Sequence, residues 1–240
     1  MNKKKVFLAV LALILVCSLS VAGTLAYLTA TQTTPVVNTF VAAGGGKIIT
    51  DGQNSFKLVE SVVEYIDAEE ATPEKPVGYY RKDGTETFAN SYDMAVPNME
   101  IPKDPKLTVD LEAGIEAYIF VKVTDTTQGN LHSAGEDTYE LTDDWKPVTI
   151  AGFEDTEALY LYKGGITTGD AEVELTGVGI LKDNKIFVKN VDGKTTNFVD
   201  TDAAATGVQL GQLKFEAYAC QAAGFADAAA AYTACFGSNP

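Results

Sequence analysis

Histidine is nearly absent from this chain, because His132 is the only one among its 240 residues. A Ser-His-acid triad would have a single possible base, and no Gly-x-Ser-x-Gly motif surrounds a serine. The zinc-protease motif His-Glu-x-x-His requires two histidines and is therefore excluded. His132 lies among Gly, Ser and Asn residues, where a lone histidine is most simply a surface residue. We predict that the chain is not an enzyme, holds no metal and uses no cofactor.

Positive charge is also scarce, since 18 Lys and Arg residues stand against 33 Asp and Glu residues, giving a formal net charge of −15. A strongly anionic surface disfavours nucleic acid and anionic membranes as partners. Acidic pairs such as Asp143–Asp144 and Glu154–Asp155 lack the ligand spacing of a calcium-binding loop. Solvated surface charge is the simpler interpretation, and we expect no nucleic-acid partner.

Only one long hydrophobic run is present, and it lies at the start of the chain. A basic segment, Asn2–Lys5, precedes the apolar run Val6–Val16, and small residues follow in Val21–Ala26. These are the three parts of a secretory signal. The whole stretch is about long enough to cross a bilayer, so a permanent anchor is the alternative, but Ser, Gly and Thr interrupt its second half. We therefore predict export, with membrane association only through the uncleaved signal.

Cysteine is limited to three residues, and Cys17 would be lost with the signal. The other two, Cys220 and Cys235, form an even pair in an exported chain, which favours a disulfide. Closing a loop of this length would stabilise the fold by roughly 3 kcal/mol in the chain-entropy model. Two buried free thiols are the alternative.

Alternation of apolar and polar residues is the clearest pattern in the rest of the chain. Leu107–Leu111 and Ala117–Val123 both alternate and flank a turn at Ala113–Gly114, so we predict two adjacent antiparallel strands. The segment Ser55–Ile66 fits both strand and helix spacing. Asp83–Gly84 has the composition of a hairpin turn between two short strands.

The end of the chain changes its pattern from strand to helix. Gln212–Ala219 alternates like a strand, and over 224–236 a helical stripe is formed by Phe225, Ala229, Tyr232 and Phe236. The lone Trp145 is more simply a core anchor than a ligand platform, because a β-sandwich needs large apolar residues between its sheets. These patterns predict an all-β fold with a short C-terminal helix.

A short β-prone segment follows the signal. Val36–Val41 lies between Pro35 and the glycines Gly44, Gly45 and Gly46. A glycine-rich linker is flexible and extends the reach of such a strand. The strand can therefore pair either with its own sheet or with the sheet of a neighbouring molecule.

Several segments resemble the TasA/camelysin family of secreted proteins. They are Gly23–Thr29 and Asn38–Ala42 near the start, Val96–Pro105 and Ala117–Val123 in the middle, and Phe215–Gln221 and Phe225–Phe236 at the end. The resemblance implies cleavage between Ala26 and Tyr27 by a dedicated SipW-type signal peptidase, with a site after Ala22 or Gly23 as the alternative. It also implies a jelly-roll-like β-sandwich with a short C-terminal helix.

The resemblance divides the chain into a signal peptide over 1–26, a donor strand with its glycine hinge over 27–46, and a β-sandwich domain over 47–240. Residues 67–95 have no counterpart in the family and are a possible insertion. Cys220 and Cys235 stand where the family usually has aliphatic or alanine residues, and their joint departure supports a disulfide between the last strand and the helix.

The function implied by the resemblance is structural. We expect a secreted subunit of extracellular biofilm-matrix fibres in Gram-positive bacteria, found at the cell surface or in the matrix. Homo-oligomeric filaments would grow as each subunit donates its N-terminal strand to the open sheet edge of the next. The residues assigned to that strand are Val36, Val37, Asn38, Thr39, Phe40 and Val41, with Gly44, Gly45 and Gly46 as the hinge.

Two other functions remain open from the sequence. An adhesion domain could present a carbohydrate-binding face of tyrosines, although such residues more often pack as cross-strand pairs; the candidates are Tyr79, Tyr80, Tyr160 and Tyr162. A camelysin-like protease is the third hypothesis, because camelysins have been described as metalloproteases. The lack of a histidine ligand set weighs against it.

Overall fold

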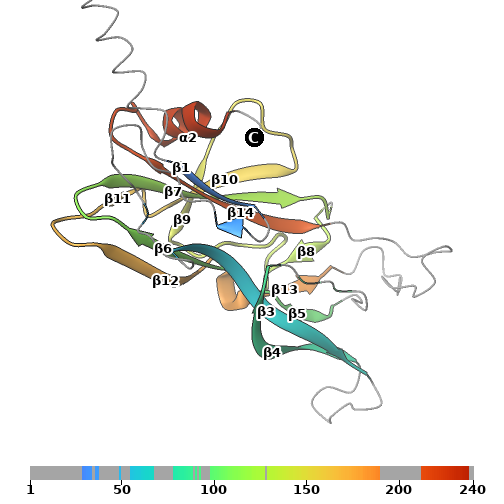
Figure 1. Ribbon diagram of the computed structural model, residues 1–240. Helices are drawn as coiled ribbons and strands as arrows, with labels where there is room; N and C mark the ends of the chain where they lie inside the picture. Colours follow the sequence, from blue (N-terminus) through green and yellow to red (C-terminus); the bar gives the residue numbers. More distant parts are fainter. Residues whose placement is uncertain are drawn as a thin grey trace, which may run out of the picture.

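The computed structural model describes residues 29–33, 36–37, 49, 55–67, 78–88, 90, 92, 98–127, 129–189 and 212–237. Two antiparallel sheets lie face to face, with a smaller third sheet beside them (Figure 1). The seven-stranded sheet has the order β2-β1-β14-β7-β10-β9, and β11 also pairs with β7. Its strands are β1 (Thr29–Thr33), β2 (Val36–Val37), β7 (Glu116–Asp125), β9 (Trp145–Val148), β10 (Glu157–Tyr162), β11 (Ile166–Thr167) and β14 (Leu213–Gln221).

The other two sheets are smaller. The four-stranded sheet has the order β12-β6-β3-β4 and the three-stranded sheet the order β5-β13-β8. Their strands are β3 (Phe56–Ile66), β4 (Tyr79–Thr87), β5 (Glu100–Pro102), β6 (Lys106–Leu111), β8 (Leu131–His132), β12 (Val173–Gly179) and β13 (Lys185–Val188). A 3-10 helix, η2 (Lys182–Asn184), precedes β13, and α2 (Ala228–Phe236) follows β14. The predicted all-β sandwich with a short C-terminal helix is confirmed.

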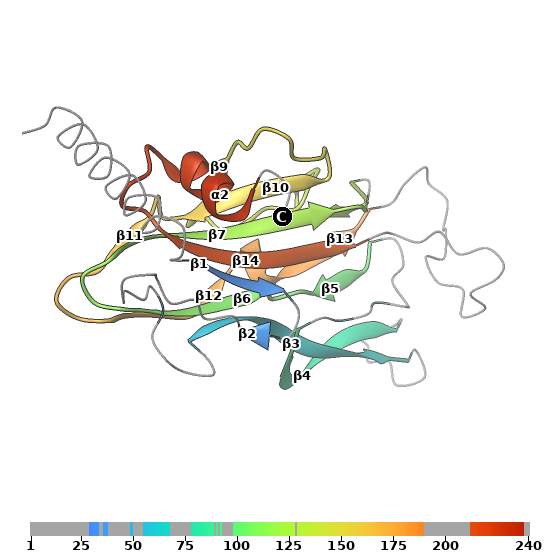
Figure 2. The same cartoon turned by 45° about the horizontal axis from the view of Figure 1, so that its top comes forward.

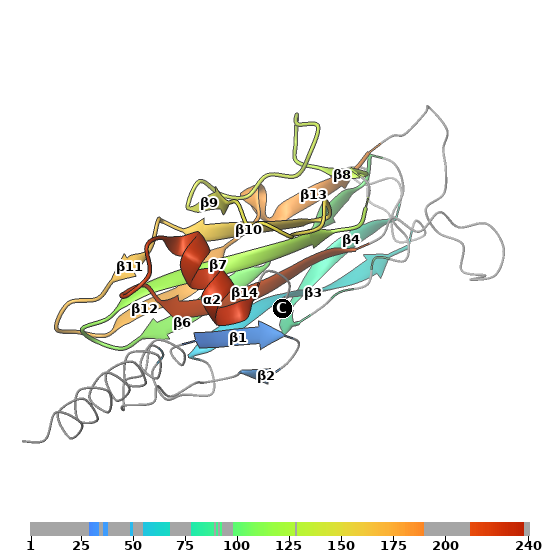
Figure 3. The same cartoon turned by 90° about the horizontal axis from the view of Figure 1, so that it is seen from above.

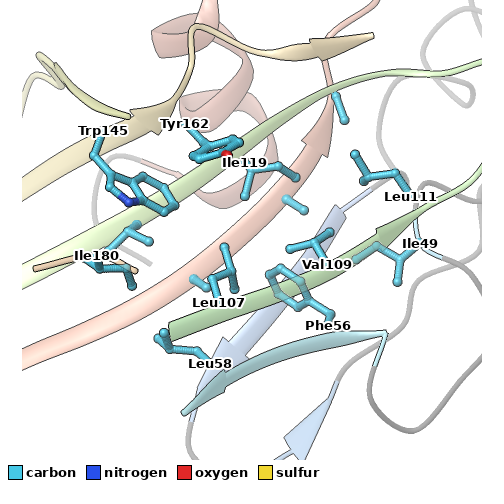
Figure 4. Packing of buried hydrophobic residues seen from close by; sticks show 14 of the residues in the cluster. Ile49, Phe56, Leu58, Leu107, Val109, Leu111, Ile119, Trp145, Tyr162 and Ile180 are labelled. Carbon is cyan, nitrogen blue, oxygen red and sulfur yellow. The ribbon is translucent and has the colours of Figure 1, made fainter. Parts of the chain in front are cut away.

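The main core fills the space between the two larger sheets (Figure 4). Every second residue of β7 points into it, because successive side chains of a strand alternate between faces; these residues are Ala117, Ile119, Val121 and Val123. They meet the apolar face of the four-stranded sheet, which includes Phe56, Leu107 and Val109. The alternation in the sequence therefore arises because each strand buries one face in this shared core.

Trp145 is buried in the main core, as the sequence predicted. Its ring packs against Tyr162 with 5.2 Å between the ring centroids. Its indole Nε1 donates a hydrogen bond to the backbone oxygen of Gly179 at 3.0 Å. The single polar atom of the side chain is thus satisfied, which allows the whole residue to be buried.

The opposite face of the seven-stranded sheet is covered by α2 (Figure 3). The ring of Tyr232 packs against Phe120 of β7 and Tyr218 of β14, with 5.3 and 5.4 Å between ring centroids. The helix begins at Ala228 rather than at residue 224, because the Asp227 carboxylate accepts a hydrogen bond from the Ala230 backbone N–H and caps it. The predicted helix is therefore present with a later start.

The predicted pairing of Leu107–Leu111 with Ala117–Val123 is wrong. β6 pairs with β3 and β12, whereas β7 pairs with β10, β11 and β14. The turn between them carries the chain from one sheet to the other. Both segments alternate because each buries one face in the same core, and alternation does not specify which strand is the neighbour.

Residues 67–95 include β4, the edge strand of the four-stranded sheet. The hairpin turn predicted at Asp83–Gly84 is wrong, because these residues form a bulge within this single strand. The Asp83 carboxylate accepts hydrogen bonds from the N–H and the hydroxyl of Thr85, and Gly84 adopts a φ of +88°. The ambiguous segment Ser55–Ile66 forms the long strand β3 beside it.

Candidate assembly edge

Residues 216–220 of β14 are buried like those of an interior strand, although only one long strand lies beside β14. β7 pairs with it along its whole length. On the core face Ala217 and Ala219 are fully buried, and on the face under α2 Tyr218 and Cys220 are at most 2% exposed. Buried backbone N–H and C=O groups without partners cost free energy. A strand of this kind therefore requires a hydrogen-bonded neighbour along its second edge too.

The second edge of β14 is paired by β1, from the other end of the chain (Figure 2). Thr29 opposes Cys220 and Gln32 opposes Ala217 in an antiparallel register. Among the described strands, none pairs with Leu213–Glu216 on this side. Within the described part of the chain, the edge is thus filled only along Ala217–Cys220.

The strand that contacts β14 differs from the one assigned from the sequence. Val36–Val37 forms β2, which pairs with β1 as the outermost strand of the sheet. Sequence reasoning misses β1 because Thr29–Thr33 has no apolar alternation, although threonine at every second position is β-branched and favours a strand. The remaining predicted residues of this region lie outside the described part of the chain: Ala26, Tyr27, Asn38, Thr39, Phe40, Val41, Gly44, Gly45 and Gly46.

Three other edge strands, β9, β4 and β12, carry features that hinder the addition of a strand. β9 contains Lys146 and Pro147, and proline has no N–H to offer to a new neighbour. β4 is interrupted by the Asp83–Thr85 bulge and carries exposed charged residues. The register of β12 shifts between Leu175 and Val178. Bulges and charges of this kind protect edges against edge-to-edge association, and no bulge interrupts the β14–β7 pairing.

A buried group of charges lies on the outer face, beside β14. The Lys122 ammonium is 3.3 Å from a carboxylate oxygen of Glu157 and 3.7 Å from one of Glu216, so it joins three neighbouring strands. The Phe153 ring lies over Lys122, with 5.9 Å from Nζ to the ring centroid. Lys214 adds a second cation, 2.9 Å from Glu216. These contacts hold β14 in register with β7 and β10.

The two cysteines come together on the same outer face, under α2. Cys220 lies on β14 and Cys235 on α2, and both are free thiols within one apolar cluster. The interaction with Cys235 and burial both raise the pKa of Cys220, whereas the interaction with Cys220 lowers the pKa of Cys235. The structure confirms their proximity, and the disulfide itself stays a prediction.

The remaining sequence candidates do not form one site. His132 is half-buried in β8, where its Nδ1 lies 2.8 Å from the Ser133 backbone oxygen. Tyr79 and Tyr80 belong to the four-stranded sheet and Tyr160 and Tyr162 to the seven-stranded sheet. Tyr80 and Tyr162 are also buried, so the four rings make no common surface.

Among the described residues, no three acidic, histidine or cysteine side chains are grouped so that they could hold a metal ion. Within the same ranges no helix has the length and apolar character needed to cross a membrane. Searches with this chain found no matching family model, no matching curated protein and no matching solved structure.

Proposed function

We propose that this chain is an exported structural subunit that assembles into extracellular fibres by donating its N-terminal segment to β14 of the next subunit. In the single subunit β1 occupies that edge. In the fibre the β1 and β2 segment of one molecule takes the same place on its neighbour. Each subunit then offers one strand and one edge, and such a head-to-tail contact repeats without closing.

One observation carries this proposal: residues 216–220 of β14 are buried on both faces, yet the neighbour on the second edge of this strand is the five-residue strand β1 from near the start of the chain. A terminal strand can be exchanged between copies at low cost, because the same backbone hydrogen bonds form within one molecule or between two. The interruptions in β4, β9 and β12 make those three edges less suited to accept a strand than the β14 edge. The export signal expected from the sequence is consistent with this role.

The test uses the chain that begins at Tyr27, examined by sedimentation and negative-stain electron microscopy. A synthetic peptide spanning 27–41 is added in excess to half of the samples, and a scrambled peptide of the same composition is the matched control. We expect fibres, and we expect the native peptide to shorten or abolish them because it fills the β14 edge. A second chain that begins at Lys47 should remain monomeric.

Each outcome has a definite meaning. Fibres that grow equally well with the native and the scrambled peptide would show that strand donation is wrong, while the structural role would stand. Fibres from the chain that begins at Lys47 would lead to the same conclusion. Monomers in every sample would contradict self-assembly itself.

A further inference from the structure

Cys220 and Cys235 lie in one apolar cluster but in different environments. Cys220 is fully buried under the helix, next to the aromatic residues Phe120 and Tyr218. Cys235 lies in the last turn of α2 and is only partly buried. A reagent from solution therefore meets the helix thiol first.

The acidity of the two thiols also differs, and the more exposed thiol is the more acidic one. The pKa of Cys235 is lowered by its interaction with Cys220, whereas that interaction and burial both raise the pKa of Cys220. The thiolate is the form that attacks a disulfide. Exposure and acidity thus both select Cys235 as the more reactive group.

We propose that Cys235 and Cys220 are the attacking and the resolving thiol of a dithiol–disulfide switch that fastens α2 to β14. The Cys235 thiolate attacks an external disulfide, forms a mixed disulfide and releases one thiolate. Cys220 then loses its proton and attacks the Cys235 sulfur, which expels the second thiolate. The protein loses two protons and two electrons, and the external disulfide is reduced to two thiols.

The disulfide would hold a contact that otherwise depends on aromatic packing. Phe236 lies against Tyr218 with 4.9 Å between ring centroids, and Tyr232 packs on the same strand. Cys220 is also the residue of β14 that opposes Thr29 of β1. The switch therefore acts on the strand at the assembly edge, but its chemistry does not depend on the proposed assembly.

The order of reaction can be tested with glutathione disulfide and intact-mass spectrometry on the folded chain that begins at Tyr27. We expect wild type to pass through a single glutathione adduct and to end two hydrogens lighter with no glutathione attached. The C220S variant should retain one glutathione on Cys235. The matched C235S variant should react more than about tenfold more slowly, because its remaining thiol is buried.

The same variants, unfolded in denaturant, should react at similar rates, since the fold creates the difference. Equal rates in the folded variants, or a faster reaction at Cys220, would overturn the assigned order. A wild-type product that keeps its glutathione would show that Cys220 does not resolve the adduct.

Fastening of the helix is measured separately, by hydrogen exchange of the amides of α2. Exchange should slow by about tenfold or more in the disulfide form relative to the reduced form, since local opening of the helix is restricted. The double variant C220S/C235S should exchange alike with and without oxidant. A disulfide that forms without slowing exchange in wild type would contradict the fastening. Fibre growth is not a readout in either experiment, so the switch and the proposed assembly can fail independently.

Discussion

The two faces of β7 are built from different side chains. The face toward the four-stranded sheet is entirely aliphatic, whereas the face toward α2 carries Tyr118, Phe120 and Lys122. A complete sheet seals the first face, but a nine-residue helix and the segment around Phe153 cover the second. Side chains on the inner face stabilise the fold through apolar burial. The outer face also holds a buried group of charges and two thiols.

The largest expected effect comes from the charged group of the outer face. We expect K122M to lower the free energy of unfolding by about 3–5 kcal/mol, because Glu157 and Glu216 lose the cation that lies between them. The measurement is chemical denaturation at pH 7. The matched control K214M removes an ammonium whose side chain is 49% exposed and should cost no more than about 1 kcal/mol. Equal losses in the two variants would contradict a special role for the buried lysine.

A cavity in the inner face should cost nearly as much. I119A removes most of a fully buried aliphatic side chain, and we expect a loss of about 2–5 kcal/mol. This loss should stay the same between pH 5 and pH 8, since Ile119 packs within an apolar cluster. Denaturation curves at several pH values measure it. A pH-dependent loss in I119A would mean that the two faces are energetically coupled.

Removal of the Tyr232 hydroxyl should have a smaller and opposite effect. This hydroxyl is fully buried and lies beside that of Tyr218 without reaching hydrogen-bond geometry. We expect Y232F to raise the free energy of unfolding by about 1 kcal/mol, because a buried polar atom without a partner is costly. Y92F is the contrasting variant, since the Tyr92 hydroxyl donates to the Pro102 oxygen at 3.0 Å and its loss should cost about 1 kcal/mol. If Y232F and Y92F both lower the free energy of unfolding, the Tyr232 hydroxyl is not an unpartnered polar group as assigned.

The smallest effect concerns the outer face of the four-stranded sheet. Asp110 and Glu174 oppose each other across β6 and β12, and burial together with the Glu174 charge raises the pKa of Asp110 above its usual 3.8. A carboxyl with a raised folded-state pKa contributes stability at low pH that is lost as pH rises through that pKa. We therefore expect D110N to stabilise the protein at pH 7 by about 0.2–1 kcal/mol, and to give no gain below the pKa of the unfolded chain. A gain that persists at pH 3 would contradict this origin.

Much of the fold can be predicted from the sequence, because one-sided burial leaves a period of two. The strand character of β6, β7 and β14 follows from their alternation, and the helical stripe predicts α2. Sheet membership could not be predicted, since β6 and β7 face the same core from opposite sides. The candidate edge was predicted only in part, because β1 is polar and its position follows from tertiary pairing with β14.

Buried charges were the features hardest to foresee. From the sequence, Lys103 and Asp104 belong to a proline-containing lead-in before a strand. In the structure both are buried, and Lys103 lies 3.0 Å from Glu60. Asp104 accepts hydrogen bonds from Ser61 and Lys82, and these contacts outweigh its burial and lower its pKa to about 2. Each partner is distant in sequence, so no local pattern indicates the network.

The pairing of β1 with β14 of its own chain has a kinetic consequence. A tethered strand competes for its edge at an effective concentration on the order of millimolar, well above the protein concentration of a dilute solution. In the proposed assembly, a lone subunit would therefore pair its own β1 with its own β14 and would not add to a fibre. Growth would then begin slowly and accelerate once a fibre end offers an unoccupied β14, so short preformed fibres should abolish the lag.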